Sequence, residues 1–270
     1  MNMPARETIL SVDHVGMQFG GLVALSDLNF TVGEGEILSL IGPNGAGKTT
    51  AFNLMTGFLT PTKGAVKFGD VPLRGLKSHE IADLGLIRTF QRTSVFPRDT
   101  VFDNVLIGLH RQGKLGLLEA ILGLPKARAS ERLLRERAAE LVSRVGLEAR
   151  TNDLAGSLSY GEQRLVGVAL ALAAQPKMLL LDEPVSGMNA SETHTFVQLI
   201  RRIRDSGVTI LLVEHDMPMV MSVSDRIVVL NYGRIIAEGP PEEIRTNPAV
   251  IEAYLGQSAK DVVKEVAAHA

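Results

Sequence analysis

One stretch decides the fold of this chain: Gly42-Pro43-Asn44-Gly45-Ala46-Gly47-Lys48-Thr49-Thr50. It contains the pattern G-x-x-x-x-G-K-T, whose glycines let the backbone curl so that successive N–H groups point inward at an anion. The apolar residues 37–41 before it predict a strand, and residues 51–56 after it predict a helix that ends at Gly57. Since this motif requires that context, the nine residues predict a nucleotide-binding loop rather than a chance glycine-rich turn.

Two side chains of the loop carry the expected phosphate chemistry. Lys48 is expected to reach the β- and γ-phosphates, and the Thr49 hydroxyl is expected to hold Mg²⁺. The helix that begins here adds its unpaired N–H groups and the positive end of its dipole.

Length and composition narrow the remaining possibilities. A chain of 270 residues exceeds one typical domain, so we expect a core domain with one or two subdomains. The formal charge of −2, without blocks of like charge, gives no electrostatic case for nucleic-acid binding. The absence of cysteine excludes disulfides and fits a reducing cytoplasm. No signal peptide is recognisable, and the longest apolar run, residues 165–174, is far short of the ~18–20 residues of a membrane span. We therefore expect a soluble chain, for which any membrane role must come through a partner.

The first third of the chain predicts a small antiparallel layer beside the core. Strands are expected at residues 8–19, at residues 22–32 with a break near Asp27, and at residues 65–68 before a Gly69-Asp70 turn. A short helix capped by Ser78 is expected to run through Leu84, and a strand is expected at residues 87–91.

Residues 92–157 differ in pattern and predict an inserted helical subdomain. Helices are expected at residues 103–110 and 128–145. The second carries an apolar stripe of Leu133, Leu134, Ala138, Leu141, Val142 and Val145, while Arg and Glu cover its solvated face.

The core resumes at residue 158. Helices at residues 161–174, 191–205 and 217–223 alternate with strands at residues 177–182, 208–213 and 226–230, and then come a hairpin strand at 234–237 and short helices at 242–244 and 249–255. Alternating strands and helices predict an α/β fold with a mainly parallel sheet and ligands at the carboxyl ends of its strands.

A pair of carboxylates follows the apolar strand at residues 177–182. Asp182 is expected to reach Mg²⁺ beside the phosphate loop, and Glu183 to polarise a water that attacks the γ-phosphate. Charges at a strand end are common by chance, but the phosphate loop upstream favours the catalytic interpretation.

A third motif, Leu158-Ser159-Tyr160-Gly161-Glu162-Gln163, reads locally as a helix capped by Ser159. L-S-x-G-[EQ]-Q shortly before an apolar strand that ends in Asp-Glu-Pro also resembles the signature sequence of the ABC transporter ATPases, and the resemblance covers nearly the whole chain. It implies the ABC ATPase fold. Its division would be residues 1–91 and 158–256 for the nucleotide-binding core with its antiparallel layer, 92–157 for the helical subdomain, and 257–270 for a tail.

The resemblance also implies roles for residues that mean little alone. Phe19 matches the aromatic residue that stacks on adenine, and Gln91 matches the glutamine that meets the metal and links catalysis to the membrane partner. His215 matches the switch histidine at the γ-phosphate, and residues 186–189 match the dimer-contact loop. Read locally, Phe19 and His215 would more often be structural residues.

The family mechanism implies a head-to-tail pair of ATPase chains. One chain supplies the phosphate loop, metal and base for ATP, and Ser159, Gly161 and Glu162 of the other close the site from a helix N-terminus. This sequence departs from common family residues at Tyr160, Glu162, Leu170 and Asn189. Leu170 removes an expected ion pair and Asn189 a charge at the dimer contact, but neither is needed for phosphate chemistry.

One subgroup matches best. Residues 88–91, 158–161, 187–189, 214–217 and 238–256 are similar to the longer ATP-binding subunit of branched-chain amino-acid importers. This implies a second ATPase, two membrane permeases and a periplasmic binding protein as partners, with the chain at the cytoplasmic face of the inner or plasma membrane. Transporters of urea, amides or lipopolysaccharide remain alternatives.

The permease is expected to dock around residues 92–101, with Phe96, Pro97 and Val101 as apolar contacts and Arg92 and Arg98 at the rim. A subdomain loop covered by its own chain is the alternative.

Two other classes of protein compete with this interpretation. One is a phosphate-loop kinase or GTPase, for which no acceptor or base-reading motif is found, and the other is a non-transport ABC ATPase. The latter usually carries a long coiled coil or two ATPase units, and this chain has neither.

Overall fold

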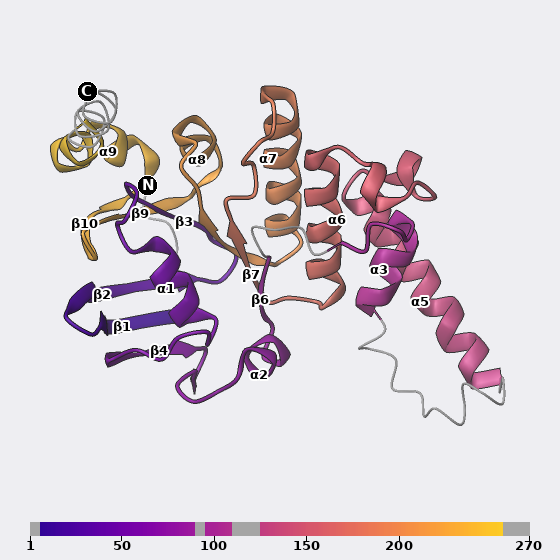
Figure 1. The fold of residues 1–270 in the computed structure, drawn as a ribbon, viewed down its shortest axis with the longest axis horizontal. Helices are drawn as coiled ribbons and strands as arrows, with labels where there is room; N and C mark the ends of the chain where they lie inside the picture. Colours follow the sequence, from indigo (N-terminus) through magenta and orange to yellow (C-terminus); the bar gives the residue numbers. More distant parts are fainter. Residues whose placement is uncertain (1–5, 90–94, 110–124, 256–270) are drawn as a thin grey trace.

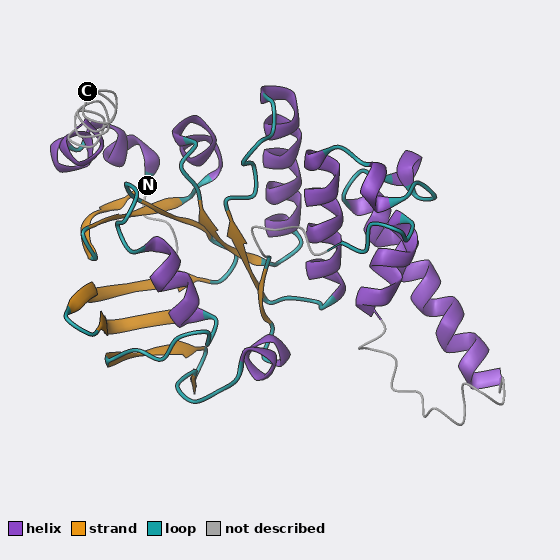
Figure 2. Ribbon diagram, in the orientation of Figure 1, coloured by secondary structure: helices purple, strands orange, loops and turns teal. Residues whose placement is uncertain are grey.

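A computed structural model describes residues 6–89, 95–109 and 125–255 (Figure 1). Two sheets and a row of helices make up the molecule (Figure 2). Within the described residues, no helix has the length and apolar character needed to span a membrane.

The central sheet has six strands in the order β10-β9-β3-β8-β7-β6. β3 (Ile37–Ile41), β6 (Leu86–Arg88), β7 (Met178–Asp182), β8 (Thr209–Val213) and β9 (Arg226–Asn231) are parallel, and β10 (Arg234–Gly239) pairs antiparallel with β9. Every residue of β3, β7 and β8 is buried, as expected for strands covered on both faces. The carboxyl ends of the parallel strands therefore share one edge, and the predicted catalytic residues follow them.

The second sheet is antiparallel, with four strands in the order β2-β1-β4-β5. Its strands are β1 (Thr8–Phe19), β2 (Leu22–Gly33), β4 (Lys63–Phe68) and β5 (Val71–Pro72). The expected break of the second strand near Asp27 is wrong, because β2 is continuous. The pairing of β1 with β2 is instead irregular, with bulges at several positions. The Asp27 carboxylate pairs with His14 of the neighbouring strand.

Several helices lie around the two sheets (Figure 1). They are α1 (Lys48–Met55), α2 (Ser78–Asp83), α7 (Ala190–Asp205), α8 (Met217–Val223) and α9 (Pro241–Thr246). Ser78 is the first residue of α2 and does not cap it; Lys77 is the N-cap, and its N–H donates to the Glu80 carboxylate at 2.7 Å. A further short helix at residues 248–255 ends the described chain.

The helical region consists of α3 (Val101–Leu109), α5 (Pro125–Arg144) and α6 (Tyr160–Ala173), which pack on one another beside α7 (Figure 1). The apolar stripe of α5 is buried at Leu134, Ala138 and Val142. Leu133 was wrongly included, since it is 50% exposed: it lies one residue off the spacing that faces α3 and α6. A division of the chain at residue 158 stays a prediction.

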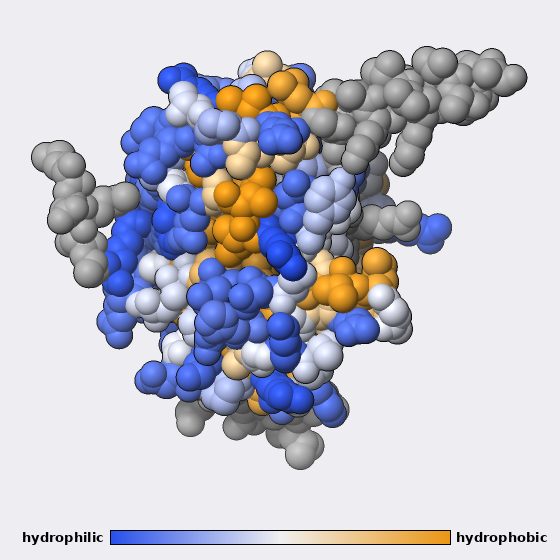
Figure 3. Space-filling model, turned by 90° about the vertical axis from the view of Figure 1, so that its left-hand side faces the viewer, coloured by the Kyte–Doolittle hydropathy of each residue, from blue (hydrophilic) through white to orange (hydrophobic). Residues whose placement is uncertain are grey.

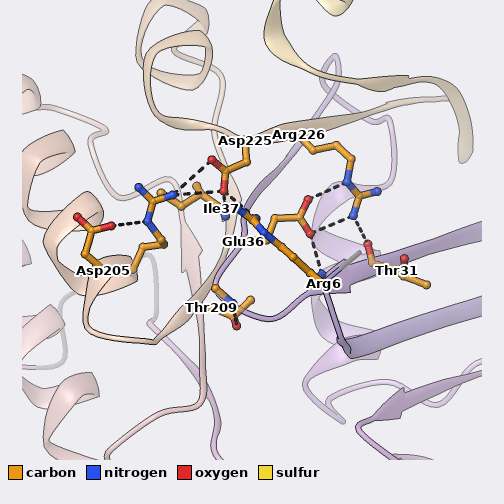
Figure 4. Close-up of polar contacts among 11 residues, drawn as sticks. Arg6, Thr31, Glu36, Ile37, Asp205, Thr209, Asp225 and Arg226 are labelled. Atoms are coloured by element: carbon orange, nitrogen blue, oxygen red, sulfur yellow. Dashed lines mark hydrogen bonds and ion pairs between the residues drawn. The ribbon is translucent and has the colours of Figure 1, made fainter. Parts of the chain in front are cut away.

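A polar network joins the two sheets at the amino ends of the parallel strands (Figure 4). Glu36, before β3, pairs with Arg226 at 2.7 Å, and Arg226 also donates to the Thr31 carbonyl of β2 at 2.6 Å. Asp225 accepts from the Ile37 N–H at 3.1 Å and pairs with Arg6 at 3.0 Å. This network lies at the sheet edge opposite the phosphate loop, so it holds the layers together away from the chemistry.

Candidate nucleotide-binding site

The phosphate loop begins where β3 ends, and its backbone admits only glycine at two positions. Gly42 has φ +152°, and an added Cβ would lie 2.1 Å from the Leu230 carbonyl oxygen. Gly47 has φ +106°, and an added Cβ would lie 2.7 Å from Leu25 Cδ2 and 3.1 Å from the Ala24 carbonyl oxygen. The glycines of the motif therefore have a steric reason: β9 and β2 approach the loop too closely for any side chain.

Lys48 folds over the loop that precedes it. Its Nζ donates to the carbonyl oxygens of Gly42 at 2.5 Å and Pro43 at 3.0 Å. Burial lowers the pKa of this amine, while the charges of Glu183 and Asp182 oppose that effect. A positive charge thus lies in the concavity of the loop, close to both carboxylates.

One cavity, of about 390 Å³, joins the predicted phosphate site to the predicted base. Glu183 lines it, and so do Asn44, Gly45, Ala46, Gly47, Lys48, Thr49 and Thr50 of the loop, with Leu22, Val23, Ala24 and Tyr232 on other elements. Phe19, the predicted adenine contact, is 45% exposed at the end of β1 and does not line the cavity. Tyr232 was not predicted to lie here, since the approach of the β9–β10 turn to the loop depends on the order of the strands in the sheet.

A larger hollow, of about 1180 Å³, lies on the antiparallel sheet between His14, Lys63 and Arg234. Figure 3 looks onto this side of the molecule, where a band of apolar side chains runs between hydrophilic ones. Lys48, the loop backbone and Glu183, which the sequence predicts to meet the phosphates, line the smaller cavity and do not line the larger hollow.

Asp182 and Glu183 lie at the carboxyl end of β7, as predicted. The Asp182 side chain is only 11% exposed and pairs with Arg88 of β6 at 2.7 Å. Arg88 also donates to the Asn53 side chain of α1 at 2.7 Å. The predicted metal ligand is therefore bound to a cation of its own chain, a contact that the sequence reasoning did not anticipate. Gln91 lies outside the described residues.

Glu183 and His215 approach each other from neighbouring strands. Asp182 of β7 is in register with Val213 of β8, and the Glu183 N–H donates to the Val213 carbonyl at 2.8 Å. The Glu183 carboxylate lies 4.0 Å from His215 Nδ1. Glu183 has φ +45°, an unfavourable conformation for a residue with a side chain. Such strain is typical of a functional position.

The signature residues lie elsewhere in the chain. Ser159 caps α6 by accepting the Glu162 N–H at 3.2 Å, and the Glu162 carboxylate accepts the Ser159 N–H at 2.9 Å. The predicted cap is confirmed. Gly161 and Glu162 line a hollow with the start of α7, and none of these three residues lines the cavity at Lys48. A single chain thus does not bring the two motifs together.

The fold and these motifs agree with known proteins. The profile of the ABC transporter family matches residues 25–186. The chain belongs to this family. The profile of the branched-chain amino acid ATP-binding cassette transporters matches residues 234–260. The resemblance predicted from the phosphate loop and signature is thereby confirmed, and so is the fold class.

Individual proteins that the chain resembles indicate which subgroup of the family is most similar to it. The chain is 46% identical over 253 residues to the high-affinity branched-chain amino acid transport ATP-binding protein LivG of Escherichia coli (strain K12), covering 93% of this chain and 99% of LivG. Among solved structures, the ADP conformation of MJ1267, an ATP-binding cassette, matches with a TM-score of 0.80 and 30% identity over 92% of this chain and 99% of that chain. The dimeric post-hydrolysis state of the cassette MJ0796 with ADP and Pi matches with a TM-score of 0.71 and 25% identity, over 86% and 98% of the two chains.

Proposed function

We propose that this chain is the ATP-binding and ATP-hydrolysing subunit that powers an importer of branched-chain amino acids. The supporting observation is the cavity in which the phosphate loop, Lys48 and Glu183 meet, in a chain 46% identical to LivG over most of its length. The curled loop and Lys48 bind the phosphates, and Glu183 polarises the attacking water. His215, 4.0 Å from Glu183, contacts the γ-phosphate from the neighbouring strand.

Mg²⁺ fits the donor set of this site. No cluster of three acidic or histidine side chains that could hold a metal by itself occurs among the described residues. Mg²⁺ bound with phosphate needs only one or two protein oxygens, the remainder being phosphate and water. We assign the Thr49 hydroxyl, the Asp182 carboxylate and the Gln91 side chain to it; bound there, it would neutralise charge on the phosphates. Asp182 must then exchange or share its contact with Arg88.

We assign the signature residues to a second ATPase subunit's nucleotide. Ser159 is exposed at the N-cap of α6, Glu162 is half-buried and Gly161 is buried, and none of the three lines the cavity at Lys48 of their own chain. A head-to-tail pair of cassettes would place them on the partner's ATP, so that ATP closes the interface and hydrolysis opens it. The solved structure of the similar cassette MJ0796 is dimeric, which supports the pairing of two cassettes.

The membrane partners would contact the segment before α3. Within the described part of it, Phe96 is 50% exposed and Arg98 is exposed, while Val95 is half-buried. We propose that two permease subunits dock there and place the chain at the cytoplasmic face, with a periplasmic binding protein acting indirectly. Reversal of charge at Arg98 should then weaken transport more than it weakens ATP hydrolysis by the free chain.

The test of hydrolysis is Glu183→Gln, with the exposed Glu140→Gln on α5 as the matched control. Glu183→Gln should bind ATP as wild type and lose roughly 10²–10⁴-fold in turnover, the usual contribution of a general base. Glu140→Gln should retain both. Unchanged hydrolysis in Glu183→Gln would remove Glu183 from this role.

The cargo is tested by reconstitution with the permeases and the binding protein. Leucine, isoleucine or valine with the binding protein should stimulate ATP hydrolysis, whereas urea and short amides should not. Stimulation by the latter group alone would reassign the transporter, and failure to co-purify with any permease would reject the transport function.

A further inference from the structure

Glu214 is a fully buried carboxylate between β8 and His215. The sequence reasoning assigned it no role. Within the described residues, Glu36 and Asp182 are the other buried carboxylates, and each is paired with an arginine. Among those residues Glu214 has no arginine partner; backbone N–H groups donate to its carboxylate, and Oε2 lies 3.7 Å from His215 Nδ1.

These N–H groups come from two segments: the one after β7, which carries Glu183, and the one after β8, which carries His215. Glu214 Oε1 accepts the Val185 N–H at 3.0 Å, two residues after Glu183. Glu214 Oε2 accepts the N–H of His215 at 2.9 Å and that of Asp216 at 3.4 Å. One carboxylate therefore fastens the segment that carries the base to the segment that carries the switch histidine.

The strained backbone at Glu183 shows why such a fastening is needed. A residue at φ +45° keeps that conformation only where its surroundings hold it. The Glu183 N–H is held by the Val213 carbonyl on one side, and the chain after Pro184 is held by Glu214 on the other. Release of either contact would let the Glu183 side chain move relative to His215.

We infer that Glu214 is a positioning residue for hydrolysis: its carboxylate joins the Glu183 loop and the His215 loop into one unit. This rests on the proposed ATP hydrolysis. Because Glu214 is buried and contacts backbone, it acts through Glu183 and His215 and not on the nucleotide. The two loops should consequently respond together when the γ-phosphate is bound or lost.

Glu214→Gln tests the inference with little change of shape. Its amide has one acceptor oxygen, which can serve Val185 or His215 but not both, and its NH₂ group faces a donor. We expect kcat to fall roughly 10–100-fold, the effect of a displacement of about 1 Å, while the affinity for ATP stays within about twofold. Amide hydrogen exchange should accelerate at Val185 or at His215 and Asp216.

Glu36→Gln is the matched control, because Glu36 is also a buried carboxylate that accepts a backbone N–H, that of Gly33 at 2.7 Å. It lies just before the amino end of β3 (Figure 4), whereas Glu214 follows the carboxyl end of β8. We expect a lower melting temperature and an unchanged kcat, measured well below that temperature. If Glu214→Gln behaves in the same way, with lower stability and a wild-type kcat, Glu214 is only structural and the inference is overturned.

Two further variants separate this inference from the proposed function. If Glu183→Gln retains full turnover, the assignment of the base fails, whereas a dead Glu183→Gln beside a fully active Glu214→Gln refutes only the positioning role. The double variant should be no slower than Glu183→Gln, since residues that act as a unit are not additive. If Glu214→Gln does not fold, Glu214→Asp keeps the charge but is too short to hold both loops. It should show the same loss of kcat at unchanged ATP affinity, and a wild-type kcat would overturn the inference.

Discussion

Asn104 offers a quantitative test of how the segment before α3 is held. Its side chain is fully buried, and both its oxygen and its nitrogen form hydrogen bonds to the backbone. Oδ1 accepts the Phe96 N–H at 2.7 Å, and Nδ2 donates to the carbonyl oxygens of Phe96 at 3.0 Å, Thr100 at 2.9 Å and Asp99 at 3.4 Å. Asn104→Asp keeps the shape and the acceptor but replaces the donor by a second oxygen.

The magnitude follows from these contacts. The two short Nδ2 bonds are worth about 1 kcal/mol each, so their loss costs about 2 kcal/mol. The carbonyls keep other partners, for example the Ala155 N–H on Asp99, so none becomes unpaired. The new charge, however, is buried beside the carbonyl oxygens of Phe96, Asp99 and Thr100, which adds about 2 kcal/mol until the group takes up a proton. We expect a loss of about 4 kcal/mol at pH 8.

Urea unfolding at pH 8 measures the difference, with the exposed Asp103→Asn on the same helix as control. In the control a carboxamide replaces a carboxylate, which is the reverse exchange at an exposed position. We expect the free energy of unfolding to change by less than about 1 kcal/mol, the usual contribution of an exposed charge in the first turn. The Asn104→Asp deficit relative to wild type should shrink towards pH 5, where a buried carboxyl takes up a proton and regains a donor. A loss below about 1 kcal/mol at pH 8, or a deficit that grows towards pH 5, would refute the reasoning.

The remaining predictions concern strain, metal and pH. Glu183→Gly should raise the melting temperature by about 1–3 °C by relieving the left-handed backbone, while turnover is lost; a lower melting temperature would contradict the strain argument. Arg88→Gln should free Asp182, so that less Mg²⁺ is needed for half-maximal nucleotide binding, and an unchanged Mg²⁺ titration would show that the ion pair does not compete. A hydrogen bond to Asp27 raises the pKa of His14. The stabilisation that this pair contributes should be full below about pH 6.5 and should disappear as the pH rises through the pKa of the folded protein. A His14 titration by NMR should have its midpoint above 6.5 and return to about 6.5 in Asp27→Asn.

The sequence alone located the phosphate loop and most elements of the core sheet. A run such as residues 178–182 is buried on both faces whatever its neighbours are, and a loop with glycines at fixed spacing specifies its own curl. The predicted ends of α2 and β6 differ from the structure, in which Lys77 caps α2 and β6 runs from Leu86 to Arg88, because such ends depend on single local contacts.

Tertiary structure decided which polar groups meet. Arg88 and Asp182 are 94 residues apart, and Val185 and Glu214 are 29 apart, so no local pattern relates them. They meet because β6, β7 and β8 are neighbours in the sheet with a fixed register, which brings their carboxyl ends to one edge. The sequence by itself determined which chemistry is available, and the order of the strands determined which groups hold one another in place.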